Sequence, residues 1–283
     1  MFPMFTGIKG DPTKRAVRKG TTSNNLGTIM TSGRFFVGLI AISSLAGGYS
    51  LQALSYDANV TPNVIFGTGN GNGFWTVDLQ NNIELGLRAK VRYQGIYNSG
   101  GDGTYSFDPG VSSGSAAKWN YEFAINVNQD GSTSDTISDY DIWLSIDIDP
   151  SQGQNFITFS PFQAWSDNSF GDNSTAQSGG IEASDFPGQL TLMGQYYVAQ
   201  NSQNIGWLAV GSPPVPLVDV NADGTYDFKL FATRAGANDV LAQTSMRVIV
   251  GQGGAPVPDG GATFGLLAVP VLALLGLRRR VSS

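Results

Sequence analysis

Apolar and polar residues alternate along several segments in the middle of the chain. Between residues 83 and 93 the odd positions are apolar, whereas Glu84, Arg88, Lys90 and Arg92 fall on the opposite face. The same period of two recurs in residues 118–128 and 140–149. Because successive side chains of a strand point to opposite faces, we expect three strands, each with one buried and one solvent-exposed face.

Further strands are expected at residues 74–79, 156–159, 190–199, 205–210, 226–233 and 240–250. Gly, Asn, Asp, Ser and Pro clusters separate these segments, and no stretch of residues 54–250 shows a sustained helical period. The pattern predicts an all-β fold, a single antiparallel, jelly-roll-like β-sandwich that occupies residues 54–250.

The N-terminal part of the chain reads as an export signal. Arg34 precedes an apolar run over residues 35–46, and small residues follow, which is the order of a secretory signal peptide at residues 30–53. Cleavage is expected after Ala46 or after Ala53. Residues 1–29 are polar and basic, and we interpret them as a disordered extension or a mis-called start, with Met30 as the candidate start.

The C-terminal part predicts a Gly/Pro linker at residues 251–261 and an apolar helix at residues 262–283. Residues 262–277 carry no charge, and a helix of that length spans about 24 Å, which is short of the roughly 30 Å hydrocarbon core. The arginines that follow favour a cytoplasmic end. A plain membrane anchor is one interpretation of this tail, and a sorting signal that is removed after use is the other.

The tail combines a short motif, an apolar stretch and an arginine cluster, formed by Val257, Pro258, Asp259, Gly260, Gly261, Arg278, Arg279 and Arg280. It resembles the PEP-CTERM class of bacterial sorting signals in its VPDSG-like variant, with Gly where Ser is usual. The resemblance implies transient membrane insertion, recognition by an exosortase, cleavage near the motif, and delivery to the cell envelope, the outer surface or the extracellular matrix. Segments between the two signals, such as "KWNYEFAINV" and "DGTYDFKLFA", resemble those of uncharacterised bacterial surface proteins that carry such tails. This resemblance implies a localisation but no known activity.

The net charge and the absence of two residue types exclude several classes of function. Residues 54–253 hold seven basic against 20 acidic residues, a formal net charge of −13, which repels phosphate backbones and argues against nucleic-acid binding. The chain has neither Cys nor His, so thiol catalysis, a Ser-His-Asp triad and His-ligated zinc are excluded. Glycosidase chemistry with two carboxylates stays open, although no catalytic residue can be assigned.

One loop has the spacing of calcium ligands. Oxygen-bearing side chains occupy relative positions 1, 3, 5 and 9, Gly224 lies at position 6, and a backbone carbonyl is available at position 7, which matches the start of an EF-hand loop. Position 12 is Leu230 instead of Glu, so a tight turn that opens a hairpin is the other interpretation. The candidate Ca²⁺ ligands are Asp219, Asn221, Asp223, Thr225 and Asp227.

Three other features have a structural and a functional interpretation. Asp141, Asp147 and Asp149 are expected to form a solvated strand face, balanced across strands by the basic residues at 88, 90 and 92, and not a metal cluster. The glycine-rich segment 67–73 is expected to be a turn and not a phosphate loop, because a strand follows it. Trp143 and Trp165 are the candidates for aromatic side chains that stack on a glycan.

Three hypotheses for the function follow. The sequence favours a non-enzymatic structural or adhesive protein of the bacterial envelope or extracellular matrix, with an exosortase and extracellular polysaccharide as partners. The first alternative is a glycan-binding β-sandwich, with or without assistance from calcium. The second is a carboxylate-based polysaccharide hydrolase.

Overall fold

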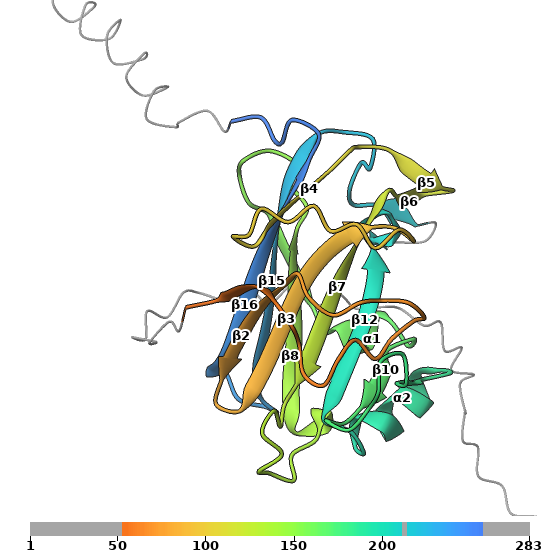
Figure 1. Ribbon diagram of the computed structural model, residues 1–283. Helices are drawn as coiled ribbons and strands as arrows, with labels where there is room; N and C mark the ends of the chain where they lie inside the picture. The colour runs from red at the N-terminus through yellow and green to blue at the C-terminus, as the bar shows by residue number, and fades with distance from the viewer. Residues whose placement is uncertain (1–52, 211–213, 257–283) are drawn as a thin grey trace, which may run out of the picture. The chain divides into compact units, whose positions relative to one another are not determined.

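The computed structural model describes residues 53–210 and 214–256, in which two large β-sheets pack face to face (Figure 1). Sheet A has seven strands, all paired antiparallel. In spatial order they are β1 (Ser55–Ala58), β2 (Trp75–Gln80), β3 (Ile83–Val91), β7 (Trp119–Asn126), β12 (Val198–Asn204), β10 (Ser169–Gly171) and β11 (Ile181–Glu182).

Sheet B has five strands. In spatial order they are β4 (Thr104–Phe107), β16 (Val240–Val250), β15 (Gly224–Arg234), β8 (Tyr140–Asp147) and β9 (Phe156–Phe159). The pair β4–β16 is parallel and the other neighbours are antiparallel. The predicted β-sandwich is therefore confirmed, with one parallel pair at the edge of sheet B. The apolar run of the predicted signal peptide and the predicted C-terminal helix lie outside the described residues.

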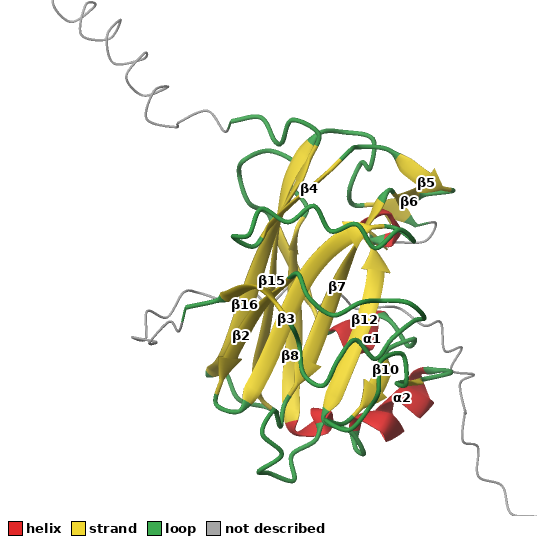
Figure 2. Ribbon diagram, in the orientation of Figure 1, coloured by secondary structure: helices red, strands yellow, loops and turns green. Residues whose placement is uncertain are grey.

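Short elements complete the described part of the chain (Figure 2). Two ribbons pair β5 (Val111–Ser113) with β6 (Ala116–Ala117), and β13 (Ala209–Val210) with β14 (Val215–Pro216). The helices are α1 (Pro161–Ala164), α2 (Phe186–Met193) and the 3₁₀ turns η1 (Ile137–Asp139) and η2 (Ile205–Trp207).

Two predicted strands are wrong in part. The segment 190–199 begins inside α2, and only its end enters β12. The side chain of Asp185 caps α2 by accepting a hydrogen bond from the Gly188 amide, and Pro187 occupies the first turn, so local start signals override the apolar run. The segment 205–210 begins with η2 and reaches only the two-residue strand β13.

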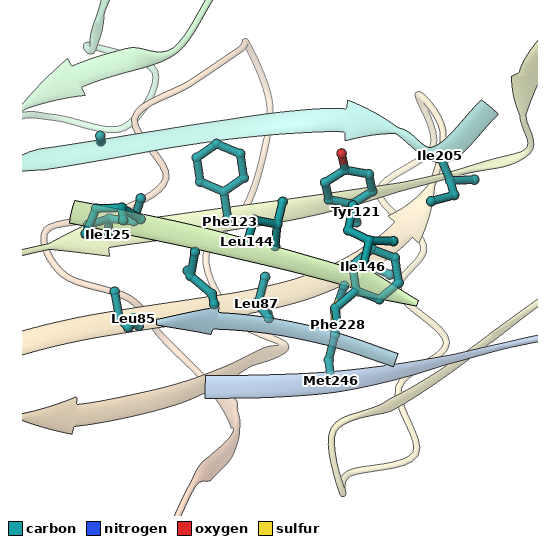
Figure 3. Packing of buried hydrophobic residues seen from close by; sticks show 14 of the residues in the cluster. Leu85, Leu87, Tyr121, Phe123, Ile125, Leu144, Ile146, Ile205, Phe228 and Met246 are labelled. Carbon is teal, nitrogen blue, oxygen red and sulfur yellow. The ribbon is translucent and has the colours of Figure 1, made fainter. Parts of the chain in front are cut away.

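The core lies between the sheets and is built by the alternation that the sequence predicts. The inner faces of β3, β7, β8, β15 and β16 supply apolar side chains that are almost fully buried (Figure 3). Figure 3 labels ten residues of the core, nine from these strands and Ile205 from η2: Leu85, Leu87, Tyr121, Phe123, Ile125, Leu144, Ile146, Ile205, Phe228 and Met246. The predicted alternation ends at Val91, because Tyr93 adopts a φ of 62° and is 85% exposed.

The expectation of a solvent-exposed outer face is wrong for sheet A. Residues 59–74, which we call the cover segment, cross the outer face of β3, β7 and β12 and appear in orange in Figure 1. They form a second apolar cluster, whose members come from the cover segment, β2 and β7: Val60, Val64, Phe66, Trp75, Val77 and Ala124. The polar residues on the outer face of β3 and β7 are consequently buried.

Buried polar side chains of sheet A provide the hydrogen-bond partners of the cover segment. Glu84 accepts a hydrogen bond of 2.6 Å from the Thr61 amide, and Asn126 donates to the Thr61 carbonyl. Gln200 accepts from the Ile65 amide and donates to the Asn63 carbonyl. An irregular backbone can be buried only when its polar groups are paired, so these side chains take the place of a further strand.

Candidate functional site

The outer face of sheet B, unlike that of sheet A, is open along β15 and β16. Over residues 225–231 and 242–250 the outward side chains are exposed or half-buried and alternate with buried inward ones. We call this surface the groove face, and its residues on the two strands are Thr225, Asp227, Lys229, Phe231, Gln243, Ser245, Arg247 and Ile249. It holds two adjoining cavities of about 360 Å³ each.

The two cavities share a charged pair at their centre. The Arg247 guanidinium donates from Nε and from its second terminal nitrogen to the two oxygens of Asp227, at 2.7 and 2.9 Å. Gln154, from the loop between β8 and β9, donates to Asp227 at 2.6 Å. Burial alone would raise the pKa of Asp227, but the hydrogen bonds from Arg247 and Gln154 outweigh it and lower the pKa. The carboxylate therefore stays ionised and oriented.

Aromatic and small polar groups extend the groove face. The Lys229 ammonium lies 4.2 Å from the centre of the Phe156 ring. Trp143 of β8 pairs in register with Phe231 of β15, and both side chains are half-buried on the outer side. Flat aromatic surfaces beside charged and amide groups are suited to sugar rings, which present an apolar face and a hydroxyl edge.

Asp147 is a second carboxylate of this region, but it lies below the surface. Its side chain accepts hydrogen bonds from the Asn155 and Asp149 amides, and the residue is 1% exposed. Desolvation raises its pKa, with smaller contributions in the same direction from the charges of Asp227 and Asp149. A general acid of a glycosidase must reach the bond that it cleaves, and the surrounding loop encloses Asp147.

The structure separates several residues that the sequence groups together. Asp141 and Asp147 lie on β8 of sheet B, and Asp149 lies in the loop that follows it. Asp141 accepts a hydrogen bond from the Gly236 amide. The basic residues at positions 88, 90 and 92 belong to sheet A or the turn after β3, so the predicted cross-strand balance is wrong. Arg88 and Lys90 pair instead with Glu122 of the neighbouring strand.

The two candidate stacking residues do not form one platform. Trp165 packs at the edge of the core, with its ring 5.3 Å from Phe159 and 6.2 Å from Tyr121 in edge-on contacts. The most exposed tryptophan in the described residues is Trp207, at 49%. Sequence reasoning did not single it out, and its position a few residues before a Gly/Pro-rich stretch of the sequence is the signal that could have done so.

The candidate calcium residues have protein partners in this structure. Asp219 accepts from the Asn221 amide, and Asp227 is held by Arg247. Asp223 accepts from the Gln252 amide and Thr225 from the Gly254 amide, so these two side chains secure the segment that follows β16. In residues 53–210 and 214–256 no group of three or more acidic side chains could hold a metal ion. Calcium binding at this loop stays a prediction.

The glycine-rich segment 67–73 is irregular backbone with bends, within the cover segment, and its carbonyl groups have a partner. Arg88 donates to the carbonyl oxygens of Gly71 and Gly73, at 2.9 and 2.7 Å. The loop thus presents oxygens to a cation, which is the opposite of the amide groups that a phosphate loop presents to an anion.

The sorting residues 257–261 and 278–280 and the cleavage candidate Ala46 lie outside the described residues. Ala53 is exposed and lies two residues before β1. Residues 251–256, the start of the predicted linker, are tied to the sandwich. Besides the bonds to Asp223 and Thr225, the Gln152 amide donates to the Ala255 carbonyl at 2.9 Å.

Comparison with known families identifies the tail. A family model for the VPDSG-CTERM motif matches residues 256–281. The chain therefore carries a PEP-CTERM-type C-terminal sorting signal, which indicates export and sorting to the cell envelope or surface. Signals of this kind are generally processed by an exosortase-type membrane enzyme. Among the described residues, no helix is both long and apolar enough to cross a membrane.

The comparisons tell less about the body of the protein. No curated protein matches the chain. Among solved structures, a family 123 glycoside hydrolase from Clostridium perfringens, described in connection with glycolipid glycan hydrolysis, aligns at 11% identity and a TM-score of 0.20. The alignment covers 59% of this chain and 27% of that enzyme. A likeness at this level carries no argument about fold or function.

Proposed function

We propose that this protein is a non-enzymatic structural or adhesive component of the bacterial envelope or extracellular matrix. The observation that carries the proposal is the sorting signal at residues 256–281. The strongly acidic composition of residues 54–253 and the absence of Cys and His from the chain support it. An exosortase would recognise the tail and cleave it near residues 257–261. The sandwich is then the part that works outside the cell.

Glycan binding through the groove face is the mode of adhesion that the geometry supports. Two cavities adjoin there, a guanidinium and a carboxylate are held in a fixed orientation, and aromatic rings lie along the neighbouring strands. Charge-assisted hydrogen bonds orient sugar hydroxyls, and the rings pack against the apolar faces of the sugar. We therefore propose extracellular polysaccharide as the partner.

A polysaccharide hydrolase receives less support from the same residues. Two carboxylates with opposite pKa shifts lie in one region, as a glycosidase requires. However, Asp227 is engaged by Arg247, and Asp147 is enclosed by its own loop. Release of soluble sugars from host polysaccharide, lost in an Asp147→Asn or Asp227→Asn variant, would favour the hydrolase.

The sorting step is tested by the intact mass of the protein recovered from envelope and matrix fractions of its host. The expected mature form begins after Ala46 or Ala53 and ends within residues 257–261, and additional mass would identify an attached group. A membrane species that retains residues 278–283 would mean a plain anchor and would refute exosortase sorting.

The binding step is tested with the mature protein on extracellular polysaccharide purified from the same host. Arg247→Gln is expected to weaken binding about 10- to 100-fold, because charge-assisted hydrogen bonds contribute about 1.5–3 kcal/mol. Arg234→Gln is the matched control, since both arginine side chains are 51% exposed and each pairs with an aspartate. Equal affinities of the two variants would refute polysaccharide binding through the groove face and would not affect the sorting result.

A further inference from the structure

Lys90, Glu122 and Asn70 form a side-chain triad on the outer face of sheet A that the proposed function does not use. The Lys90 ammonium donates a hydrogen bond of 2.5 Å to the side-chain oxygen of Asn70. It also lies 2.5 Å from the Glu122 carboxylate. Lys90 is on β3, Glu122 is on the adjacent strand β7, and Asn70 is in the cover segment, so the triad joins the cover segment to the sheet.

The geometry brings an amine close to a carboxamide carbon. A carbonyl bond is about 1.23 Å long, so Cγ of Asn70 lies within about 3.7 Å of the Lys90 nitrogen. Reactions within a bound pair become fast when the reacting atoms are held about 3–3.5 Å apart. The other end of the amide is oriented as well, because Nδ2 of Asn70 donates to the Phe66 carbonyl at 3.2 Å.

The cover segment is held in place at Asn70 and in the three residues after it. Arg88 binds the carbonyl oxygens of Gly71 and Gly73, and Gln177 donates to the backbone carbonyl of Asn70 itself. Because the Lys90 ammonium already contacts the side chain of Asn70, the reacting groups meet without further movement of the cover segment. This fixed arrangement supplies the orientation that a reaction between two neutral side chains needs.

The site is largely closed to water and carries an excess of positive charge. Lys90 is 5% exposed, Glu122 is fully buried, and the ring of Phe66 lies 5.8 Å from the Lys90 nitrogen. Two cations, Arg88 and Lys90, share the single carboxylate of Glu122. Buried charge without full compensation is costly, so a reaction that removes the lysine charge and leaves one arginine with one carboxylate is favoured.

We propose that Lys90 and Asn70 condense into an intramolecular amide bond, with Glu122 as the group that transfers the proton. Glu122 accepts a proton from the Lys90 ammonium, and the free amine attacks Cγ of Asn70 with its lone pair. Glu122 passes this proton to Nδ2 and accepts the second proton from the attacking nitrogen, so that the bond between Cγ and Nδ2 breaks and ammonia leaves with that electron pair. Ammonia then takes the second proton from Glu122 and departs as ammonium, which leaves the Glu122 carboxylate beside Arg88. A lysine ammonium and a carboxamide thus become a secondary amide and an ammonium ion, so no oxidant or cofactor is required.

The cross-link would give this cysteine-free chain a covalent connection between the cover segment and β3. Disulfides fill that role in many exported proteins, and an amide has the further property that reducing agents do not cleave it. The link closes a loop from position 70 to position 90 and fixes the segment that buries the outer face of sheet A.

Mass spectrometry of the mature protein from its host tests the proposal. The intact mass is expected to fall short of the sequence mass by one ammonia molecule. After trypsin digestion, residues 89–92 are expected to remain uncut at Lys90 and to be joined to the peptide that ends at Arg88 and contains Asn70. A succinimide at Asn70-Gly71 would give the same mass deficit but separate peptides. Separate peptides would therefore overturn the proposal.

Variants assign the roles within the triad. Lys90→Arg keeps the positive charge and Asn70→Ala removes the acceptor, and both are expected to abolish the linked peptide. Lys118→Arg replaces an exposed lysine and is expected to retain it. Glu122→Gln is expected to leave most molecules unlinked, and full linkage in that variant would overturn the role of Glu122. The linked peptide of the wild-type protein is a readout that does not depend on the folding of any variant.

Discussion

Replacing Arg88 with methionine is expected to destabilise the protein far more than the same replacement at Arg234. Both arginines pair with a carboxylate at similar distance, Arg88 with Glu122 at 2.6 Å and Arg234 with Asp135 at 2.8 Å. The two pairs differ in burial. Both side chains of the first pair are fully buried, whereas the Arg234 side chain is 51% exposed. The comparison therefore measures what the cover segment contributes.

The magnitude follows from the contacts that are lost. Removing one partner of a buried ion pair costs up to about 3–5 kcal/mol, because the remaining charge stays out of water. Lys90, which also contacts Glu122, offsets part of that cost. The carbonyl groups of Gly71 and Gly73 also lose their donor, at a cost of about 1–3 kcal/mol for each group that stays buried. These costs belong to one network and do not add, so we expect about 3–5 kcal/mol. The exposed pair of Arg234 contributes about 0.2–1 kcal/mol.

Urea unfolding followed by tryptophan fluorescence at pH 7 separates the two cases. With an m-value of about 2 kcal/mol/M, Arg88→Met should lower the midpoint by about 1.5–2.5 M and Arg234→Met by less than about 0.5 M. Equal midpoints for the two variants would show that Arg88 is hydrated, and the cover segment would then not close over sheet A.

Two further predictions concern the cover segment and a close backbone approach. Burial raises the pKa of Glu84, so protonation of Glu84 favours the folded state, and this stabilisation is lost as the pH rises through that pKa. The wild-type protein should therefore gain stability relative to Glu84→Gln as the pH falls from 7 to 4. Urea titrations measure this difference in stability, and a difference that stays constant with pH would contradict the prediction. A Cβ at position 206 would lie 2.1 Å from the Ser115 carbonyl oxygen, so Gly206→Ala should lower the free energy of unfolding by about 1–3 kcal/mol. A Cβ at position 71 meets no atom within 4 Å, so Gly71→Ala should lower it by less. Equal thermal midpoints of the two variants would refute the steric argument.

The inner half of the sandwich could be predicted from the sequence because alternation is a local property. The strands β9 and β16 occupy the predicted ranges 156–159 and 240–250, and the apolar positions of β3, β7 and β8 face the core. The helix α2 was missed because its apolar residues continue an apolar run, although Asp185 and Pro187 are ordinary helix-start signals.

The outer face of sheet A could not be predicted by the same reasoning, because the cover segment has no period. Charged residues on one face of a strand indicate solvent only when nothing is packed against them. One signal was present in Gly86, which interrupts the strand pattern: a Cβ there would lie 2.8 Å from the Val60 side chain and 3.2 Å from the Trp75 ring. A glycine inside a strand often marks the close approach of another segment.

The candidate site was predicted only in its parts. Asp227 and Trp143 were singled out for different reasons, and their place on one surface follows from the pairing of β15 with β8 and β16. That pairing depends on contacts across the whole sheet, which no short motif encodes. The burial of Glu122 and Lys90 beneath Asn70 likewise requires the path of the cover segment across sheet A.

The position of β16 within sheet B has a mechanical consequence. The strand runs between β4 and β15 and is hydrogen-bonded on both sides, and it leads directly into residues 251–256, at the end of which the sorting signal begins. Tension applied at that end acts lengthwise along an interior strand, so the ladders on both sides bear it together. A sandwich tethered in this way resists pulling by shear across two ladders, whereas a terminal edge strand would peel away one hydrogen bond at a time.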